Sequence, residues 1–434
     1  MIAHADLTFR PEPASGPPGL APGWLHWLWD APASARRCLL AAWLGWLLDG
    51  FDVMLFALVL GVLIRDLSLS PTTAGLLGSL TLIASGFGGV LFGMIADRYG
   101  RRPALSGSLL VYSVFTFACG LSTAVWQLGL FRFLLGLGMG GEWTSGAALV
   151  SETWPDRHRA KAMGLMQSAW SVGYAAAALA VLVILPRLGW RAVFFVGILP
   201  AFVAVWVQRG IEESPEWSRS KTARPDWLRP LRAVFAPAYL RFTLLLTALS
   251  TTTLFAYWGL NFWIPTYLSF PESQGGIGLS PFRATLLVVL IQVGTFLGYV
   301  SFGFVADAFG RRRSFLVYIL TAAVLILGFG ATHNVWALSL LGPVTTFFGT
   351  GFFSGFGTVV AELYPTAIRA TAQGLTYNVG RMFSALAPFI VGLSLAQTRG
   401  FGAAFELLAF ALLLGAATWI WLPESRGWVV QVQR

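Results

Sequence analysis

Two acidic residues stand inside a long apolar stretch near the start of the chain. Asp49 and Asp52 are three residues apart, and a helix would place both carboxyls on one face. Charge inside such a stretch is costly at membrane depth, so these residues tend to serve a function. Two neighbouring carboxylates in a low-dielectric site cannot both be ionised cheaply. The pair therefore predicts a site that takes up a proton.

Another apolar stretch, 126–152, carries two more ionisable residues. Arg132 lies near its start, and Glu142 follows about 15 Å further along a helix. Glu142 belongs to a Gly-Gly-Glu-Trp sequence and is interpreted either as a second proton site or as a contact between helices. Together with Asp49 and Asp52, these two residues form the predicted proton-coupling set.

Arg381 is the most informative cation of the C-terminal part, because it lies well inside an apolar stretch. Tyr377 and Asn378 precede it by four and three residues and share its helical face. A planar guanidinium suits bidentate recognition of a carboxylate. The hypothesis is that Arg381 holds a substrate carboxylate while Tyr377 and Asn378 donate hydrogen bonds. The alternative is a structural arginine that is paired with Glu406 or Asp49.

Further polar side chains inside apolar stretches can line a binding cavity or form hydrogen bonds between helices. They are Gln167, Tyr257, Asn261, Gln292 and Tyr299. Of these, Tyr257, Asn261 and Gln292 are added to the predicted substrate-binding set.

The composition identifies the elements that must position these residues. The chain has 434 residues, of which 56% are hydrophobic and 11% charged. Soluble domains have about 45–50% apolar and about 25% charged residues. The chain is therefore predicted to be an all-α membrane protein. Two cysteines and four histidines provide no disulfide framework, metal cluster or nucleophile–base set, so we expect no enzyme, cofactor or metal.

A membrane-spanning helix needs about 20 largely apolar residues. Applied along the chain, this criterion predicts twelve spans, at 38–64, 73–96, 104–122, 126–152, 162–185, 191–209, 239–268, 281–306, 314–332, 336–363, 371–396 and 403–422. They form two six-helix bundles, 38–209 and 239–422. The remaining segments are an N-terminal tail (1–37), a central loop (210–238) and a C-terminal tail (423–434).

The net charge of +10 arises largely from short basic clusters between the predicted spans. Most lysines and arginines fall on one side if both termini are cytoplasmic, and cytoplasmic loops are the ones that carry such an excess. The expected location is the inner (plasma) membrane, in contact with lipid and with both termini in the cytoplasm. Basic clusters in loops do not predict a nucleic-acid partner.

An internal repeat relates the two bundles. GMIADRYGRR at 93–102 recurs as GFVADAFGRR at 303–312, and ETWPDRHRAKAMG at 152–164 recurs as ELYPTAIRATAQG at 362–374, each 210 residues later. Parallel repeats of this kind place a binding site between two halves that rock around it. The counterpart of Arg381 is Ser171, so the repeat places this cation in one half only.

The repeated motifs are interpreted as a gate latch. Gly93 allows two helices to approach closely, and Asp97 can lie at the positive N-terminus of a helix from the other half. The alternative is a plain basic loop. The predicted latch residues are Gly93, Asp97, Arg101, Arg102, Glu152 and Arg159 with the repeat residues Asp307, Arg311, Glu362 and Arg369.

With these motifs, nearly the whole chain resembles the major facilitator superfamily. The segments 130–143 (LFRFLLGLGMGGEW) and 188–201 (LGWRAVFFVGILPA) are similar to the sialate:proton symporter and lactate permease family. DGFD at 49–52 and NVGR at 378–381 are similar to aromatic-acid:proton symporters and organic-anion transporters. The glutamine-rich seventh span of sugar porters is absent from 239–268.

The resemblance implies a central cavity with the first and fourth spans side by side, which would bring Asp52 to Arg132. We interpret them as a coupling pair, in which protonation of Asp52 frees Arg132, or alternatively as a static ion pair. The expected function is proton-coupled symport of a small organic anion, a lactate-like monocarboxylate, by a monomer that works by alternating access. The alternative is a uniporter or exchanger of sialate, a nicotinate-like or aromatic acid, or a sugar, with a structural acidic pair.

Overall fold

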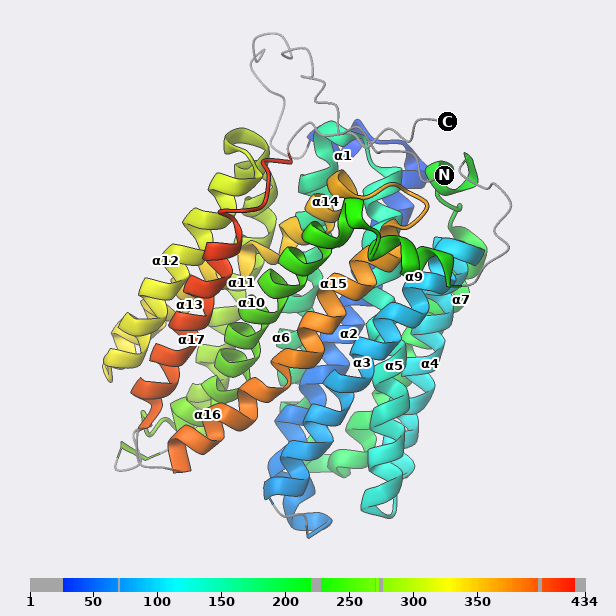
Figure 1. Ribbon diagram of the computed structural model, residues 1–434. Helices are drawn as coiled ribbons and strands as arrows, with labels where there is room; N and C mark the ends of the chain where they lie inside the picture. The colour runs from blue at the N-terminus through cyan, green and yellow to red at the C-terminus, as the bar shows by residue number, and fades with distance from the viewer. Residues whose placement is uncertain are drawn as a thin grey trace.

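The computed structural model describes residues 26–68, 71–219, 228–269, 271–272, 276–396 and 400–425, and all regular structure in these ranges is helical. Figure 1 shows long helices that run roughly side by side from one end of the molecule to the other. Helix α1 (His26–Trp29), where the described chain begins, and the C-terminal end of α17 (Gly400–Thr418) lie at the same end of the molecule (Figure 1). We call it the basic end, because it carries Arg101 and Arg311.

The first half of the molecule extends from α1 to α7. Its helices are α1 (His26–Trp29), α2 (Ala33–Asp66), α3 (Pro71–Tyr99), α4 (Arg101–Leu121), α5 (Val125–Thr153), α6 (Asp156–Phe195), the short 3-10 helix η1 (Val196–Ile198) and α7 (Leu199–Gly210). The predicted spans 162–185 and 191–209 fall within α6, η1 and α7. The backbone turns between them at Gly189, whose φ of 74° suits a residue without a side chain.

The second half follows two short helices of the central segment, α8 (Pro215–Arg219) and α9 (Arg229–Val234). Its helices are α10 (Pro237–Ser269), α11 (Pro281–Phe309), α12 (Arg311–Ala331), α13 (Val335–Gly351), α14 (Phe353–Leu363), α15 (Arg369–Ser384), α16 (Leu386–Ala396) and α17 (Gly400–Thr418). The predicted spans 336–363 and 371–396 are each divided into two helices, with breaks at Phe352 and Ala385.

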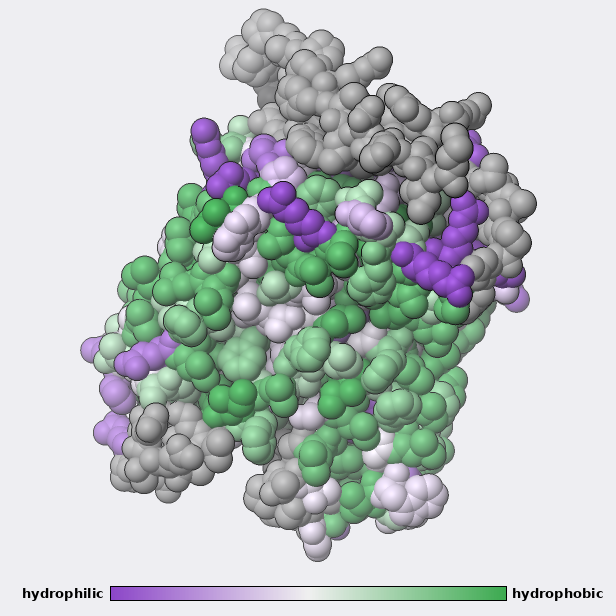
Figure 2. Space-filling view, viewed as in Figure 1, coloured by the Kyte–Doolittle hydropathy of each residue, from purple (hydrophilic) through white to green (hydrophobic). Residues whose placement is uncertain are grey.

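Nine helices or merged helices in the described ranges are long and apolar enough to cross a membrane. One of the nine, Arg157–Gly210, contains two crossings. Adding α5 and the pair α15–α16, which are outside this set, gives the twelve spans that the sequence predicts, so the predicted fold class is confirmed. Figure 2 shows hydrophobic residues over most of the visible face, as expected for a surface that lipid covers.

The two halves meet along α3 with α15 and along α6 with α11. Glycines allow the backbones to approach. A methyl group added at Gly93 would come within 2.9 Å of the Ala370 carbonyl oxygen, and one at Gly164 within 2.7 Å of the Tyr299 carbonyl oxygen. Small residues provide close helix packing in lipid, where hydrophobic burial supplies little force. The halves are therefore joined by backbone packing on the side of the basic end.

The predicted tails lie mostly outside the described residues. Of the tail 1–37, the structure describes α1 and the start of α2. Trp27 in α1 is buried against the rings of Trp154 and Phe304, with centroid distances of 5.3 and 6.2 Å. The visible end of the tail therefore packs against both halves. Of the predicted tail 423–434, only residues up to Ser425 are described.

Candidate functional site

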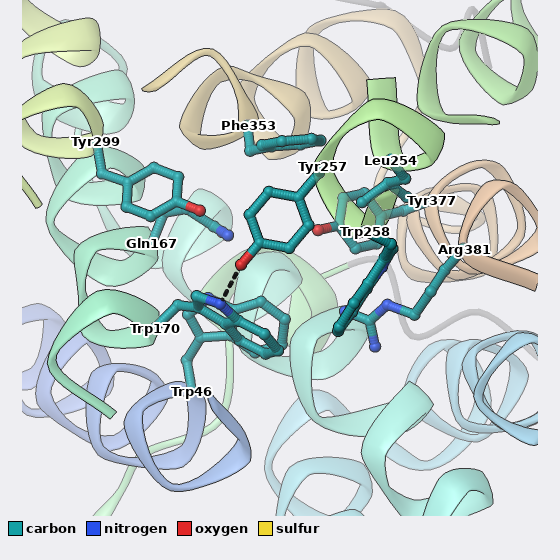
Figure 3. Close-up of a pocket in the computed structure, with 10 residues that line it drawn as sticks. All are labelled: Trp46, Gln167, Trp170, Leu254, Tyr257, Trp258, Tyr299, Phe353, Tyr377 and Arg381. Atoms are coloured by element: carbon teal, nitrogen blue, oxygen red, sulfur yellow. Dashed lines mark hydrogen bonds between the residues drawn. The ribbon is translucent and has the colours of Figure 1, made fainter. Parts of the chain in front are cut away.

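A narrow cavity lies between the two halves, near the middle of the helices. The first half contributes side chains from α2 and α6, and the second half contributes side chains from α10, α11, α14 and α15 (Figure 3). Its lining residues are Trp46, Gln167, Trp170, Leu254, Tyr257, Trp258, Tyr299, Phe353, Tyr377 and Arg381. Seven of the ten are aromatic, and a single one is charged. The cavity therefore combines flat apolar walls with one cation.

Arg381 supplies that cation from α15. Its side chain is 1% exposed, and its Nε and Nη1 atoms have no hydrogen-bond partner in the described chain. The guanidinium carbon lies 5.3 Å from the ring centroid of Tyr377 and 5.6 Å from that of Trp46. Buried donors of a charged group are normally satisfied, because leaving them unpaired is costly. This guanidinium therefore has the free donors that an anionic ligand needs.

Aromatic side chains join the halves across the cavity. The indole N–H of Trp170 in α6 donates a hydrogen bond to the Tyr257 hydroxyl in α10, which Figure 3 marks. The Trp46 and Trp170 rings lie 4.8 Å apart, and the Tyr257 and Phe353 rings lie 5.6 Å apart. These contacts form the walls of the cavity from both halves at once, so a ligand held there would touch both.

Tyr377 is fixed in place by a neighbour behind it. Its ring stacks on Trp143 of α5 with a centroid distance of 3.9 Å and an angle of 19° between the planes. The Trp143 indole donates in turn to Oε1 of Gln167, at 3.0 Å. Trp143 belongs to the first half and Tyr377 to the second, so this stack is a further contact between the halves.

The structure places two of the predicted substrate-binding partners at the cavity and three away from it. Tyr377 and Tyr257 line it with Arg381. Asn378 instead donates to the Gly140 carbonyl at 3.3 Å and to the Thr144 hydroxyl at 3.1 Å, between α15 and α5.

The other two predicted residues lie within the second half. Asn261 donates to the Tyr257 carbonyl at 3.1 Å and lines a separate small cavity between α10, α12, α13 and α17. Gln292 is buried in α11 and lines neither of the two cavities. Helical spacing alone cannot tell a residue that faces a cavity from one that faces a neighbouring helix.

A group of buried carboxyls lies beside the cavity in the first half. Asp49 in α2 and Glu142 in α5 interact electrostatically with each other and with Arg381. Oδ2 of Asp49 and both carboxyl oxygens of Glu142 have no hydrogen-bond partner in the described residues. The space for Glu142 is provided by Gly45, where a methyl group would come within 2.5 Å of the Glu142 carboxyl.

These carboxyls have no salt bridge to Arg381. Among the described residues, no carboxylate oxygen lies within 4.0 Å of the Arg381 guanidinium, and this includes the structural partners considered from sequence, Glu406 and Asp49. Sequence reasoning missed Tyr112 of α4, which interacts electrostatically with Asp49 and Glu142. A tyrosine in an apolar helix carries no signal of such a contact.

Asp52 and Arg132 lie in neighbouring helices but form no ion pair within the described chain. Asp52 accepts a hydrogen bond at 2.9 Å from the Thr116 hydroxyl of α4. The Arg132 guanidinium carbon lies 3.7 Å from the ring centroid of Phe56, and its Nε donates to the Leu77 carbonyl at 3.1 Å. The sequence did not indicate Thr116 or Phe56.

The predicted latch residues gather at the basic end. Asp97, at the end of α3, accepts hydrogen bonds from the backbone N–H groups of Ala370 (3.3 Å) and Thr371 (2.8 Å) and from the Thr371 hydroxyl (2.6 Å). It therefore lies at the N-terminus of α15, in the other half. Arg101 joins Asp97 at 3.0 Å and Glu152 at 2.7 Å, fully buried.

Arg369 and Arg159 extend this network. Arg369 lies 3.4 Å from Glu152 and 2.7 Å from Glu216 of the central segment. Arg159 donates from Nε to the Ser151 carbonyl at 2.6 Å and lies 3.9 Å from Glu216. Ion pairs thus connect α15, α5, α6 and α8.

The central segment supplies acids that were predicted only as part of a loop. Glu213 accepts from the backbone N–H groups of Arg101 (3.0 Å) and Arg102 (3.2 Å), at the N-terminus of α4. The Ser214 hydroxyl donates to Glu152. The signal in the sequence is EESPEW at 212–217, which places three acidic residues within six positions of the predicted loop.

The repeat forms a similar network in the second half. Arg311 joins Asp307 at 2.7 Å and Glu362 at 2.9 Å. Glu424 accepts from the backbone N–H of Arg311 at 2.8 Å, and Ser425 donates to Glu362 at 2.6 Å.

No group of three or more metal-ligating residues is present in the described ranges. The described side chains at the site are a guanidinium, which can bind an anion, and buried carboxyls, which can take up a proton.

Comparisons with known proteins agree with this architecture. The profile of the Major Facilitator Superfamily matches residues 42–275 and again residues 268–431. The two matches together cover nearly the whole chain. The first extends through α10, and the second covers the helices from α11 to α17.

Relatives of known or assigned activity align over most of the chain. A putative metabolite transport protein of Haemophilus influenzae is 35% identical over 399 residues, which cover 90% of this chain and 97% of that protein. A putative niacin/nicotinamide transporter of Bacillus subtilis is 31% identical and covers 89% and 95%. The cis,cis-muconate transport protein of Acinetobacter baylyi is 33% identical and covers 84% and 89%.

A solved structure supports the fold independently. The structure of a proton:xylose symporter with bound 6-bromo-6-deoxy-D-glucose superimposes with a TM-score of 0.75, and the alignment covers 92% of this chain and 98% of that one. At 19% sequence identity, this likeness concerns the fold alone.

Proposed function

The chain belongs to the major facilitator superfamily and is a transport protein, not an enzyme, and on this premise we propose that it carries a small monocarboxylate together with a proton. Transport would follow alternating access, with the central cavity as the binding site. The basic end would face the cytoplasm, as the excess of arginine there favours.

The proposal rests on one observation, the donors of the buried Arg381 guanidinium that are unpaired in the described part of the chain. Arg381 is a buried cation that lines a cavity between the halves, and two of its donor nitrogens have no partner in the described residues. A carboxylate can accept two parallel hydrogen bonds from such a fork. A neutral sugar would leave the charge uncompensated, and several polar partners for its hydroxyls would be needed.

The walls of the cavity favour a flat acid over a lactate-like one. Trp46, Trp170, Trp258, Tyr257 and Phe353 surround the space next to Arg381. Aromatic rings prefer stacked or edge-to-face contacts with other rings. The relatives named for niacin and for muconate carry names of small unsaturated acids, which agrees with this preference.

Proton coupling is supported by the acidic groups of the first half. Asp49 and Glu142 are buried beside Arg381. Asp52 is buried three residues after Asp49 on α2, and all three carboxyls have an oxygen that lacks a partner in the described chain. An unpaired buried charge is costly, and taking up a proton removes it. An anion at Arg381 adds negative charge next to these groups, so binding of the anion and of the proton would each favour the other.

The test is uptake by the purified protein in liposomes with an imposed inward proton gradient. Radiolabelled nicotinate, benzoate and lactate are compared, with glucose as the neutral control. We expect gradient-driven accumulation of the aromatic acids, weaker uptake of lactate and none of glucose. Arg381→Gln removes two charge-assisted hydrogen bonds of about 1.5–3 kcal/mol each and should lower uptake by about 100-fold or more.

Two control variants make this test specific. Arg381→Lys keeps the charge without the planar fork, so its uptake should be intermediate. Arg187→Gln removes an exposed arginine and should leave uptake unchanged. Accumulation of glucose in place of the acids would overturn the anion assignment, and exchange without response to the gradient would identify a uniporter or exchanger with a structural acidic group.

A further inference from the structure

Helix α2 offers the Arg132 guanidinium two alternative partners, one turn apart. Asp52 and Phe56 are separated by four residues and share a helical face, about 6 Å apart along the axis. In the structure the guanidinium lies over Phe56, with 3.7 Å between its carbon and the ring centroid. The guanidinium therefore does not occupy the position next to the Asp52 carboxyl, which lies one turn away on α2.

Asp52 is meanwhile held by another group. Its Oδ2 accepts a hydrogen bond from the Thr116 hydroxyl, and its Oδ1 has no partner in the described residues. The titratable and charged groups that face Asp52 are Asp49 on α2, Tyr112 and Cys119 on α4, and Arg132 on α5. The helix η1 adds only Gly197, which has no charge to contribute.

Arg132 is the single cation of this set, so its position depends on the charge of Asp52. An ionised Asp52 attracts the guanidinium, because two opposite charges in a low-dielectric site interact strongly. A protonated Asp52 offers little attraction, and the face of an aromatic ring is then the better partner for a desolvated guanidinium. The observed contact with Phe56 corresponds to the second case.

We propose that Phe56 is a positioning residue for proton coupling: it holds Arg132 while Asp52 carries a proton, and ionisation of Asp52 draws the guanidinium one turn along α2. This inference rests on the proposed proton symport. It adds the residue that sets the equilibrium between the two positions of the Arg132 guanidinium. Phe56 is not among the residues that line the central cavity, so it would not be in contact with an anion bound at Arg381.

Movement of the Arg132 guanidinium would change the contact between α5 and α3. In the observed position the Arg132 Nε donates to the Leu77 carbonyl of α3 at 3.1 Å. The Thr81 hydroxyl of α3 donates back to the Arg132 carbonyl at 3.2 Å. A guanidinium that moves to Asp52 gives up its bond to α3, and α3 packs against α15, which carries Arg381. The protonation of Asp52 is thereby linked to the helix interface between the halves.

The experiment measures the pH dependence of gradient-driven nicotinate uptake in liposomes for Phe56→Leu. Removal of the ring destabilises the arrangement in which Asp52 is protonated, so a higher proton concentration is needed. We expect the midpoint of the pH profile to move toward acid by about half to one and a half pH units, which is the usual strength of a desolvated cation–π contact. Phe56→Trp keeps a ring and should not move toward acid.

A matched control comes from the same helix. Phe51→Leu removes a buried ring that does not contact Arg132, and its profile should coincide with that of the unmodified protein. A Phe56→Leu profile that coincides with the unmodified one, or moves toward alkali, would overturn the inference. Phe56→Met fills the same space and replaces the leucine variant if that variant is not monodisperse after purification.

A second measurement separates this inference from the proposed function. Infrared difference spectra report the protonated carboxyl of Asp52 directly, and the band is assigned by its loss in Asp52→Asn. If unmodified protein shows no gradient-driven uptake, the symport proposal fails. The infrared titration still decides about Phe56: a midpoint that moves toward acid in Phe56→Leu supports it, and an unchanged midpoint refutes it.

Discussion

The segments 93–102 and 303–312, which join α3 to α4 and α11 to α12, carry the same motif, and within each half they build the same structure. Arg101 contacts Glu152 in one half at 2.7 Å, and Arg311 contacts Glu362 in the other at 2.9 Å. In both halves an acid from the segment after the sixth span accepts hydrogen bonds at the N-terminus of the third. A helix N-terminus favours such a carboxylate, because its first N–H groups are unpaired.

The two segments differ in how they contact the opposite half. Asp97 accepts three hydrogen bonds from Ala370 and Thr371 in the second half. Its counterpart Asp307 contacts Arg311 of its own half, and its Oδ2 has no partner in the described residues. The hydrogen-bonded latch that the structure describes is thus formed by one copy of the motif.

Helix boundaries explain the difference. Helix α15 begins at Arg369, so the N–H groups of Ala370 and Thr371 belong to its first turn and are free to bind Asp97. Helix α6 begins earlier in the repeat, at Asp156. The equivalent N–H groups, at Ala160 and Lys161, therefore lie beyond its first turn and bond within the helix.

Residue identity adds to the effect of the boundaries. Lys161 stands where the other half has Thr371, and it lacks the hydroxyl that donates to Asp97. Its ammonium lies 5.0 Å from the ring centroid of Phe304 instead. The repeated motif therefore determines the scaffold within each half. The contact between the halves depends on where the helix of the opposite half begins.

The largest effect is expected where the two halves are alike. Glu152→Ala and Glu362→Ala each leave a buried arginine without its main partner, which typically costs about 3–5 kcal/mol of stability. Glu152 also lies 3.4 Å from Arg369, so its loss should be the larger. Thermal unfolding of the purified variants measures both, with the Gln variants as controls that keep the shape. If either Ala variant unfolded at the same temperature as the unmodified protein, its arginine–glutamate ion pair would not stabilise the scaffold of that half.

The second-largest effect, on the opening of the basic end, should differ between the two copies of the motif. Asp97→Ala removes three hydrogen bonds across the interface, whereas Asp307→Ala removes none that the structure describes across it. A single charge-assisted bond contributes about 1.5–3 kcal/mol, which corresponds to roughly 10- to 150-fold. Asp97→Ala should therefore raise the population of molecules with an open basic end by at least this factor. Distances between spin labels at the exposed positions Tyr99 and Ala367 report this opening. Equal opening in both variants would remove the asymmetry.

The smallest effect tests the role of the hydroxyl. Thr371→Val removes one donor to Asp97 and should raise the open population about fivefold, since a hydrogen bond contributes about 1 kcal/mol. Thr371→Ser keeps the hydroxyl and serves as the control. Lys161→Thr should form no second latch, because the backbone N–H of residue 161 already bonds within α6. If this variant lowered the population with an open basic end, residue identity would matter more than the helix boundary.

Much of the architecture follows from patterns along the chain. Apolar stretches of about 20 residues identify the spans, since every backbone polar group in lipid must bond within its own helix. The repeat relates the halves, and an arginine without a counterpart marks the cavity. Asn378 shows the limit of such reasoning: it shares a helical face with Arg381, yet it bonds to α5.

Hydropathy and repetition can be seen along the chain, so they are sufficient to predict a bundle of membrane-spanning helices in two related halves. The partners of the buried charges become visible only in the packed bundle. Arg132 lies on Phe56, Asp52 bonds to Thr116, and two donor nitrogens of Arg381 have no partner in the part of the chain that the structure describes. Contacts between helices depend on rotation and register about each axis, and the packing of all the helices together fixes these.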